Sequence, residues 1–113
     1  MSEILLEGMP FDAYLEKYKI YEKTIKFMMK HLKKWHDDEP EDFQREMRAD
    51  YRTVAETYQF ERKIAAIEKN YMYDSPLLCI SFSMAINDNE GDYVAIYTAF
   101  FDLNGDFFDD LMR

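Results

Sequence analysis

The chain has 113 residues and a formal net charge of −9, because 23 acidic residues outnumber 14 Lys and Arg. Its length predicts a single domain over residues 1–113, and a hydrophobic fraction of 48% is enough to form a buried core. The negative balance argues against direct binding to nucleic acid or to anionic membranes, since both carry the same sign of charge.

The cellular compartment follows from what the sequence lacks. No apolar run approaches the roughly 20 residues that span a bilayer, and the N-terminus has no basic start of the kind found in secretion signals. Cys79 is the only cysteine, so no intramolecular disulfide can form. We therefore expect a cytoplasmic protein without membrane contact.

One helical stripe dominates the first third of the chain. Its apolar residues recur in steps of three and four, at Phe11, Tyr14, Tyr18, Tyr21, Ile25, Met28, Leu32 and Trp35. This period predicts one long amphipathic helix over residues 10–36. The lysines that fall off the stripe are expected on a solvated face, paired with acids one turn away, and not in a nucleic-acid site.

A second apolar stripe begins after Pro40, at Phe43, Met47, Tyr51, Val54 and Tyr58. It predicts a second long helix over residues 40–69. The connection between the two helices is only a few residues long, so we expect them to lie antiparallel as a helical hairpin.

The hydrophobic period changes to two after residue 76. Residues 77–86 alternate between large apolar and small side chains, which predicts a strand with one bulky and one small-residue face. Residues 93–103 are apolar on both faces and predict a central strand, and Asn104-Gly105 predicts a hairpin into a short third strand at 106–109. The predicted fold class is α+β: an antiparallel hairpin of two long helices, packed on a three-stranded antiparallel β-meander over residues 77–109.

The sequence contains no convergent set of catalytic or metal-binding residues. His31 and His36 are five residues apart, so they diverge around a helix, and Cys79 falls on the small-residue face of its strand. No nucleophile elbow and no glycine-rich phosphate loop are present. We predict no enzyme activity, no catalytic residues, no metal and no cofactor.

Acidic and aromatic residues concentrate in the C-terminal part of the chain. Residues 71–113 carry eight acids and one base, which gives a net charge of −7. Exposed aromatic rings beside charged groups are typical of protein-recognition surfaces. The predicted partner-binding residues are Glu90, Asp92, Phe101, Asp102, Asp106, Phe107, Phe108, Asp109 and Asp110. Solvated turn residues are the alternative for these acids, and a weak calcium loop is an alternative for residues 88–92.

These features favour a non-enzymatic acidic protein-binding module. It would act as an inhibitor or regulator, of the immunity or anti-defence type, by docking on a basic nucleic-acid-binding surface of a partner protein. A sheet covered on one face only leaves apolar surface open, so the alternative is a self-associating homodimer without an inhibitory role. A third hypothesis is a small-molecule-binding domain with a pocket lined by Tyr18, Tyr21, Tyr58 and Tyr97.

Overall fold

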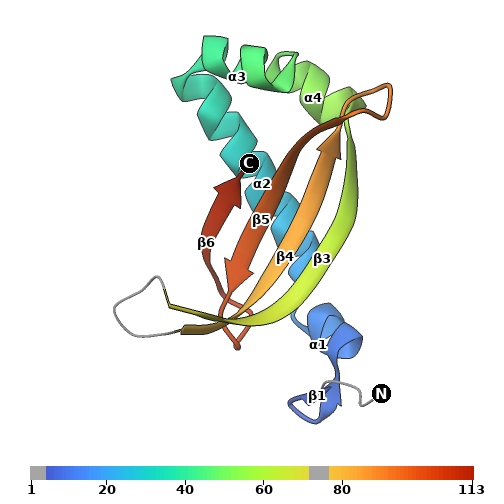
Figure 1. Cartoon of the computed structure of the whole chain (residues 1–113), viewed down its shortest axis with the longest axis vertical. Coiled ribbons are helices and arrows are strands. Elements are labelled where there is room, and N and C mark those ends of the chain that lie inside the picture. Colours follow the sequence, from blue (N-terminus) through green and yellow to red (C-terminus); the bar gives the residue numbers. More distant parts are fainter. Residues whose placement is uncertain (1–4, 72–76) are drawn as a thin grey trace.

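The computed structural model describes residues 5–71 and 77–113, in which helices pack on one face of a four-stranded antiparallel sheet (Figure 1). The elements are β1 (Leu5–Leu6), β2 (Met9–Pro10), α1 (Phe11–Lys17), α2 (Ile20–Asp38), α3 (Pro40–Met47), α4 (Tyr51–Thr57), β3 (Gln59–Asn70), β4 (Leu77–Asn87), β5 (Tyr93–Phe101) and β6 (Phe107–Met112). The α+β class and the antiparallel C-terminal meander are as predicted. The helical hairpin and the number of strands are not.

The helix predicted over residues 10–36 is split in two. α1 ends at Lys17, and Lys19 adopts a left-handed conformation with φ of 53° before α2 begins. The break places the ring of Tyr18 against Gly105 in the β5–β6 turn. The apolar period continues across the break, which is why the sequence pattern did not reveal it.

The helix predicted over residues 40–69 is wrong from residue 59 onward. α3 ends where Arg48 turns left-handed, with φ of 64°, and the Asp50 side chain caps α4 by accepting a hydrogen bond from the Thr53 N–H. From Gln59 to Asn70 the chain is extended and pairs antiparallel with β4. There is therefore no hairpin of two long helices, and the meander gains β3 as a strand.

The sheet order is β3-β4-β5-β6, so the prediction that the strand beginning at Tyr93 lies inside the sheet is confirmed. Tyr97 of β5 lies between Met84 of β4 and Met112 of β6. β6 extends to Met112, beyond the predicted end at residue 109. β1 and β2 pair only with each other.

The core lies between α2 and the sheet. The buried residues of α2 are Ile20, Thr24, Met28 and Leu32, of which only Met28 and Leu32 belong to the predicted stripe; Tyr21 and Ile25 of that stripe are half-buried. Met28 and Leu32 of α2 are fully buried, as are Met84 and Ile86 of β4 and Tyr97 of β5. Burial of each such side chain is worth about 1.5–3 kcal/mol. α2 therefore holds one face of the sheet, which leaves the other face to be considered as a functional surface.

Candidate functional site

The face of the sheet opposite α2 is covered by no described element; we call it the open face. Figure 1 looks onto it, with α2 running behind β4 and β5. Cys79, Ser81 and Ser83 of β4 point to this face, because the residues that alternate with them point into the core. Ile64 of β3 lies across from Ser83, and Phe100 of β5 lies across from Ser81.

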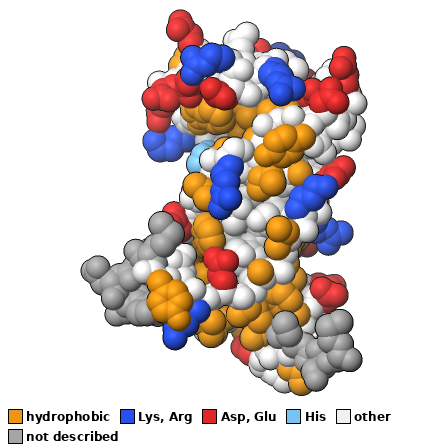
Figure 2. Space-filling view, viewed as in Figure 1, with side chains coloured by type: hydrophobic (Ala, Val, Ile, Leu, Met, Phe, Trp, Pro, Cys, Tyr) orange, Lys and Arg blue, Asp and Glu red, His pale blue; other side chains and the backbone are white. Residues whose placement is uncertain are grey.

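Hydrophobic side chains reach the surface on both sides of this small-residue centre. Ile64 is 61% exposed and Leu111 of β6 is 40% exposed, while Phe100 is half-buried. Figure 2 shows hydrophobic side chains along this face among small and polar residues, with both basic and acidic side chains between and around them. At the centre, the hydroxyls of Ser83 and Thr98 lie 2.8 Å apart and share a hydrogen bond. The open face is thus built and ordered, and it exposes apolar surface.

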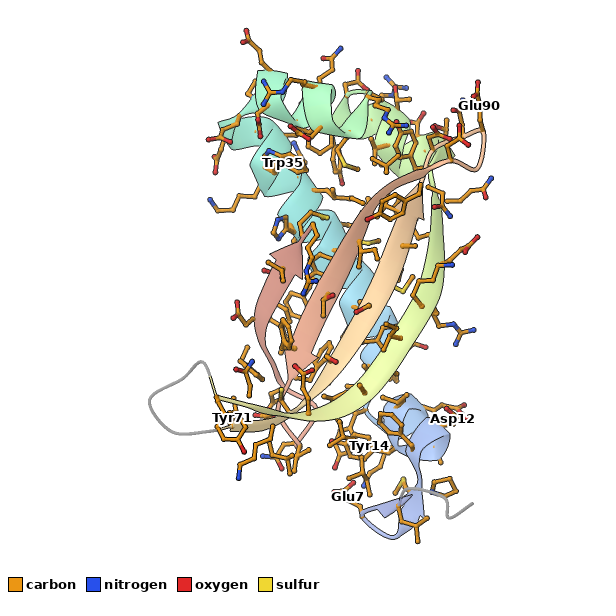
Figure 3. The ribbon with its side chains drawn as sticks, in the orientation of Figure 1. Glu7, Asp12, Tyr14, Trp35, Tyr71 and Glu90 are labelled. Atoms are coloured by element: carbon orange, nitrogen blue, oxygen red, sulfur yellow. The ribbon has the colours of Figure 1, made fainter. Side chains whose placement is uncertain are left out.

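The predicted acids do not form one patch. Glu90 and Asp92 lie in the β4–β5 turn, whereas Asp102 and Asp106 lie in the β5–β6 turn at the other end of β5. At about 3.3 Å per residue, a strand of this length separates the two turns by about 30 Å. Asp109 is exposed on β6, on the side of the strand opposite Asp110. The acids of the two turns therefore flank the open face at both ends (Figure 3 labels Glu90 at one of them), whereas Asp109 lies on the face itself, across from Phe100.

The β5–β6 turn is held firmly. The Asp102 carboxylate accepts hydrogen bonds from the backbone N–H groups of Asn104 and Asp106, at 2.8 and 3.0 Å. Lys23 of α2 donates to the carbonyl of Gly105 at 2.7 Å. Asp102 thus builds the turn, and Asp106 remains exposed on it.

The β4–β5 turn is also stabilised by an aspartate that accepts hydrogen bonds from backbone N–H groups. Asp88 accepts hydrogen bonds from the N–H groups of Glu90 and Asp92, both at 2.9 Å. Arg48 lies 3.7 Å from the same carboxylate. Asp88 therefore shapes the turn that presents Glu90 and Asp92 to solvent.

Three of the predicted binding residues face α2 instead of the open face. Phe101 is fully buried, and Phe107 stacks on Phe27 of α2 with ring centroids 3.9 Å apart. Asp110 contacts the same helix. Phe108 lies on the other side of β6, with its ring 6.4 Å from that of Phe100 on the open face. Phe107 and Phe108 point to opposite faces by the normal alternation of a strand, and the bulge opposite Phe100 and Phe101 places Asp109 across from Phe100, on the same face as Phe108.

A polar cluster that the sequence pattern did not predict joins α2 to β6. The Asp110 carboxylate lies 3.1 Å from Nδ1 of His31, and the same oxygen accepts a hydrogen bond from the hydroxyl of Tyr97 at 2.7 Å. Burial, and then this bond, raises the pKa of Tyr97 far above its usual value. His31 and Asp110 are 79 residues apart, so no local spacing signals the contact.

The lysines of α2 lie away from the open face. Lys33 pairs with Asp37 at 2.9 Å and Lys34 with Asp38 at 2.8 Å, which are the predicted contacts one turn apart. Such exposed pairs add little stability. Basic residues are also present on the sheet: Arg62 and Lys63 lie on β3, where Lys63 pairs with Glu61 at 3.2 Å.

The tyrosines proposed as a pocket lining lie in separate environments. Tyr97 and Tyr58 are core residues, and Tyr58 donates a hydrogen bond to the carbonyl of Met47. Tyr18 packs on the β5–β6 turn, and Tyr21 meets the ring edge of Phe82. This arrangement gives the third hypothesis no support.

Comparison with known proteins gives no match: no family model, no curated protein and no solved structure matches this chain. Within residues 5–71 and 77–113, no three His, Cys, Asp or Glu side chains are grouped so that they could hold a metal ion. No helix in the same ranges has the length and apolar character to cross a bilayer. Functional inference therefore depends on surface geometry and charge.

Proposed function

We propose that this protein is a non-enzymatic, acidic protein-binding module that docks on a basic surface of a partner protein through the open face of its sheet. The observation that carries the proposal is the exposure of ordered apolar surface on that face, including Ile64 and Leu111. Ile64 on β3 and Leu111 on β6 lie at the two edges of the face with Ser83 and Thr98 between them, so a partner laid across the sheet would contact both.

The charge distribution supports a basic partner. Glu90 and Asp92 lie beyond one end of the open face and Asp106 beyond the other, while the lysine-bearing side of α2 faces away. A basic partner would be attracted by the acids and held by the apolar side chains on either side of the small-residue centre. Charges at the rim of such an interface mainly raise the association rate and confer salt dependence.

An inhibitory role follows from the same chemistry. A basic groove that binds nucleic acid attracts an acidic protein surface as it attracts phosphates. A module that occupied the groove would exclude the nucleic acid. The partner class we propose is therefore a nuclease or other nucleic-acid-binding protein with a cationic groove.

The test measures binding to purified basic nucleases and nucleic-acid-binding domains at about 50 mM and about 500 mM NaCl, since salt screens exposed charges. We expect a complex that weakens at high salt and inhibits the partner's binding to nucleic acid. Ile64→Ser with Leu111→Ser should weaken it about tenfold, as loss of one interface anchor does. Leu5→Ser is the matched control, because Leu5 is 59% exposed but lies outside the sheet.

The acids are tested separately. Glu90→Gln with Asp92→Asn should slow association and reduce its salt dependence, whereas Glu41→Gln with Glu46→Gln on α3 should not. If the open-face variants and the Leu5 variant bind every tested partner equally, docking through this face is refuted.

The same face could instead pair with a second copy of the chain. Apolar surface on the open face would then be buried in a homodimer whose mass does not change with salt. The acids at both ends of the face oppose this, because two copies would bring like charges together. A salt-independent dimer in solution would favour the homodimer over the proposed function.

A further inference from the structure

A pocket of about 540 Å³ lies on the helical side of the molecule, between α2 and β6, and is separate from the open face. Its size falls within the roughly 300–1,000 Å³ of small-molecule sites. Three aromatic rings form one part of its lining, Phe27, Phe107 and Trp35, and the rest is His31 with the charged residues Lys30, Lys34, Asp38, Glu39 and Asp110. Figure 3 labels Trp35 near the C-terminal end of α2. The wall formed by the three rings suits a planar apolar ring.

The wall is rigidly built. The rings of Phe27 and Phe107 are stacked with an angle of 8° between their planes, and Phe107 also meets the edge of the buried Phe101. The indole N–H of Trp35 donates to Asp42 at 2.9 Å, which fixes the orientation of its ring. The apolar wall therefore exists before any ligand arrives.

His31 provides the pocket with a side chain that can form a directed hydrogen bond to a ligand. Nδ1 of His31 lies 3.1 Å from the Asp110 carboxylate, which also receives the hydroxyl proton of Tyr97. A carboxylate accepts hydrogen bonds and donates none, so Nδ1 must carry the hydrogen. In the neutral imidazole, Nε2 is then an acceptor.

Nε2 of His31 has no hydrogen-bond partner among the described residues, and it is not enclosed. A ligand in the pocket can therefore donate a hydrogen bond to it. Lys30 also lines the pocket; its ammonium group lies 5.4 Å from the centre of the Phe27 ring, and no carboxylate of residues 5–71 and 77–113 pairs with it. Lys34, in contrast, is paired with Asp38.

We propose that this pocket binds a hydroxyaromatic small molecule, with its ring against the Phe27–Phe107 pair and its hydroxyl donating to Nε2 of His31. A phenolic hydroxyl is acidic enough to be a strong donor, and the Lys30 ammonium stabilises the negative charge that grows on its oxygen. The pocket thus selects a ring that carries a hydrogen-bond donor over the same ring without one.

The probe is 2-naphthol, and its methyl ether, 2-methoxynaphthalene, is the matched ligand without a donor. Binding to the full chain is measured by titration calorimetry near neutral pH. We expect 2-naphthol to bind about 3- to 10-fold more tightly than the ether, the range given by one net hydrogen bond. Equal affinities, or no binding of 2-naphthol, would overturn the proposal.

Variants assign the selectivity to His31. His31→Phe should bind both ligands equally, and Lys30→Gln should weaken 2-naphthol more than the ether. His36→Phe is the matched control, because His36 packs on Phe43 and lies outside the pocket lining. Full selectivity in His31→Phe would overturn the proposal.

A spectroscopic measurement on the unmodified chain does not depend on any variant folding. Imidazole ¹⁵N spectra should show His31 with hydrogen on Nδ1, and 2-naphthol should shift its Nε2 resonance without shifting that of His36. An unshifted His31 Nε2 resonance at saturating ligand would overturn the proposal. None of these outcomes bears on docking through the open face, so the two proposals fail independently.

Discussion

Replacement of Gly105 by Ala tests how the N-terminal helix is docked on the sheet. Gly105 has φ of 80°, a conformation that costs a residue with a side chain about 1–2 kcal/mol. A Cβ at this position would lie 2.7 Å from Cγ and Cδ1 of Tyr18. The Tyr18 hydroxyl donates to Glu7 at 2.6 Å, so the ring is held at both ends and overpacking adds about 1–3 kcal/mol. The free energy of unfolding should therefore fall by about 2–5 kcal/mol.

Gly91→Ala is the matched control for this change. Gly91 has φ of 87°, and among the described residues no heavy atom lies within 4 Å of an added Cβ, so only the backbone cost of about 1–2 kcal/mol applies. Urea unfolding followed by fluorescence of Trp35, the only tryptophan, measures both variants. In a Tyr18→Ala background the extra cost at Gly105 should disappear. Equal costs of the two glycine variants in the parent chain would refute the proposed contact of Tyr18, just after α1, with the β5–β6 turn.

Three further predictions concern stability. Lys19→Gly should raise the free energy of unfolding by up to about 1 kcal/mol, because glycine adopts the positive φ of this position without strain. Lys26→Gly, inside α2, should lower the free energy of unfolding by about 1 kcal/mol. Changes of the same sign at both positions in urea titrations would refute the strain assigned to Lys19. Burial raises the pKa of Tyr14 to about 12, above the value of about 10 in the unfolded chain, so its contribution is complete below pH 10 and is lost as the pH rises toward 12. Tyr14→Phe should lessen that alkaline loss of stability in pH-dependent melting, and an unchanged alkaline profile would contradict the assignment. Met28→Ala should cost about 2–5 kcal/mol because the side chain is fully buried, and a cost below 1 kcal/mol would place α2 off the core.

Hydrophobic periodicity predicted the helices and strands in which core-facing positions recur at regular spacing. The alternation of residues 77–86 gave β4 and its two faces, because large apolar residues point to the core and small residues to the open face; both sets are buried from Cys79 onward. The stripe of residues 11–35 gave part of the buried face of the helices: Tyr14, Met28 and Leu32 are buried as predicted, but Ile20 and Thr24 are buried without belonging to the stripe. The break at Lys19 changes the direction of the chain, but apolar residues keep recurring in steps of three and four across it. The hydrophobic periodicity therefore could not predict the break.

β3 shows where sequence reasoning failed. Phe60, Ile64 and Ile67 are spaced like one face of a helix, and the charged residues between them suit helix as well as strand. The strand forms because it pairs with β4 over its length, and this distant partner outweighs local preference. The bulge between Arg62 and Ile64 also puts Ile64 on the open face, while Phe60 and Ile67 pack against the core.

The candidate sites were only partly predictable. The charge asymmetry of the C-terminal part was visible in the sequence, but β5 separates the turn acids by its length, and the register of β6 directs Asp110 toward α2. The cluster of His31, Tyr97 and Asp110 forms between distant segments and leaves no local signature. Aromatic residues were predicted as exposed, whereas Phe101 and Phe107 belong to the core and to the wall of the pocket.

The most direct test of the central claim is the mass of the purified chain in solution, measured by light scattering at about 50 mM and about 500 mM NaCl. If the open face is kept for a basic partner, the chain is a monomer of 13.7 kDa at both salt concentrations, and its complex with that partner dissociates at high salt. A dimer that persists at both concentrations, and that Ile64→Ser with Leu111→Ser converts to a monomer, would show that the open face is buried against a second copy and would contradict the account.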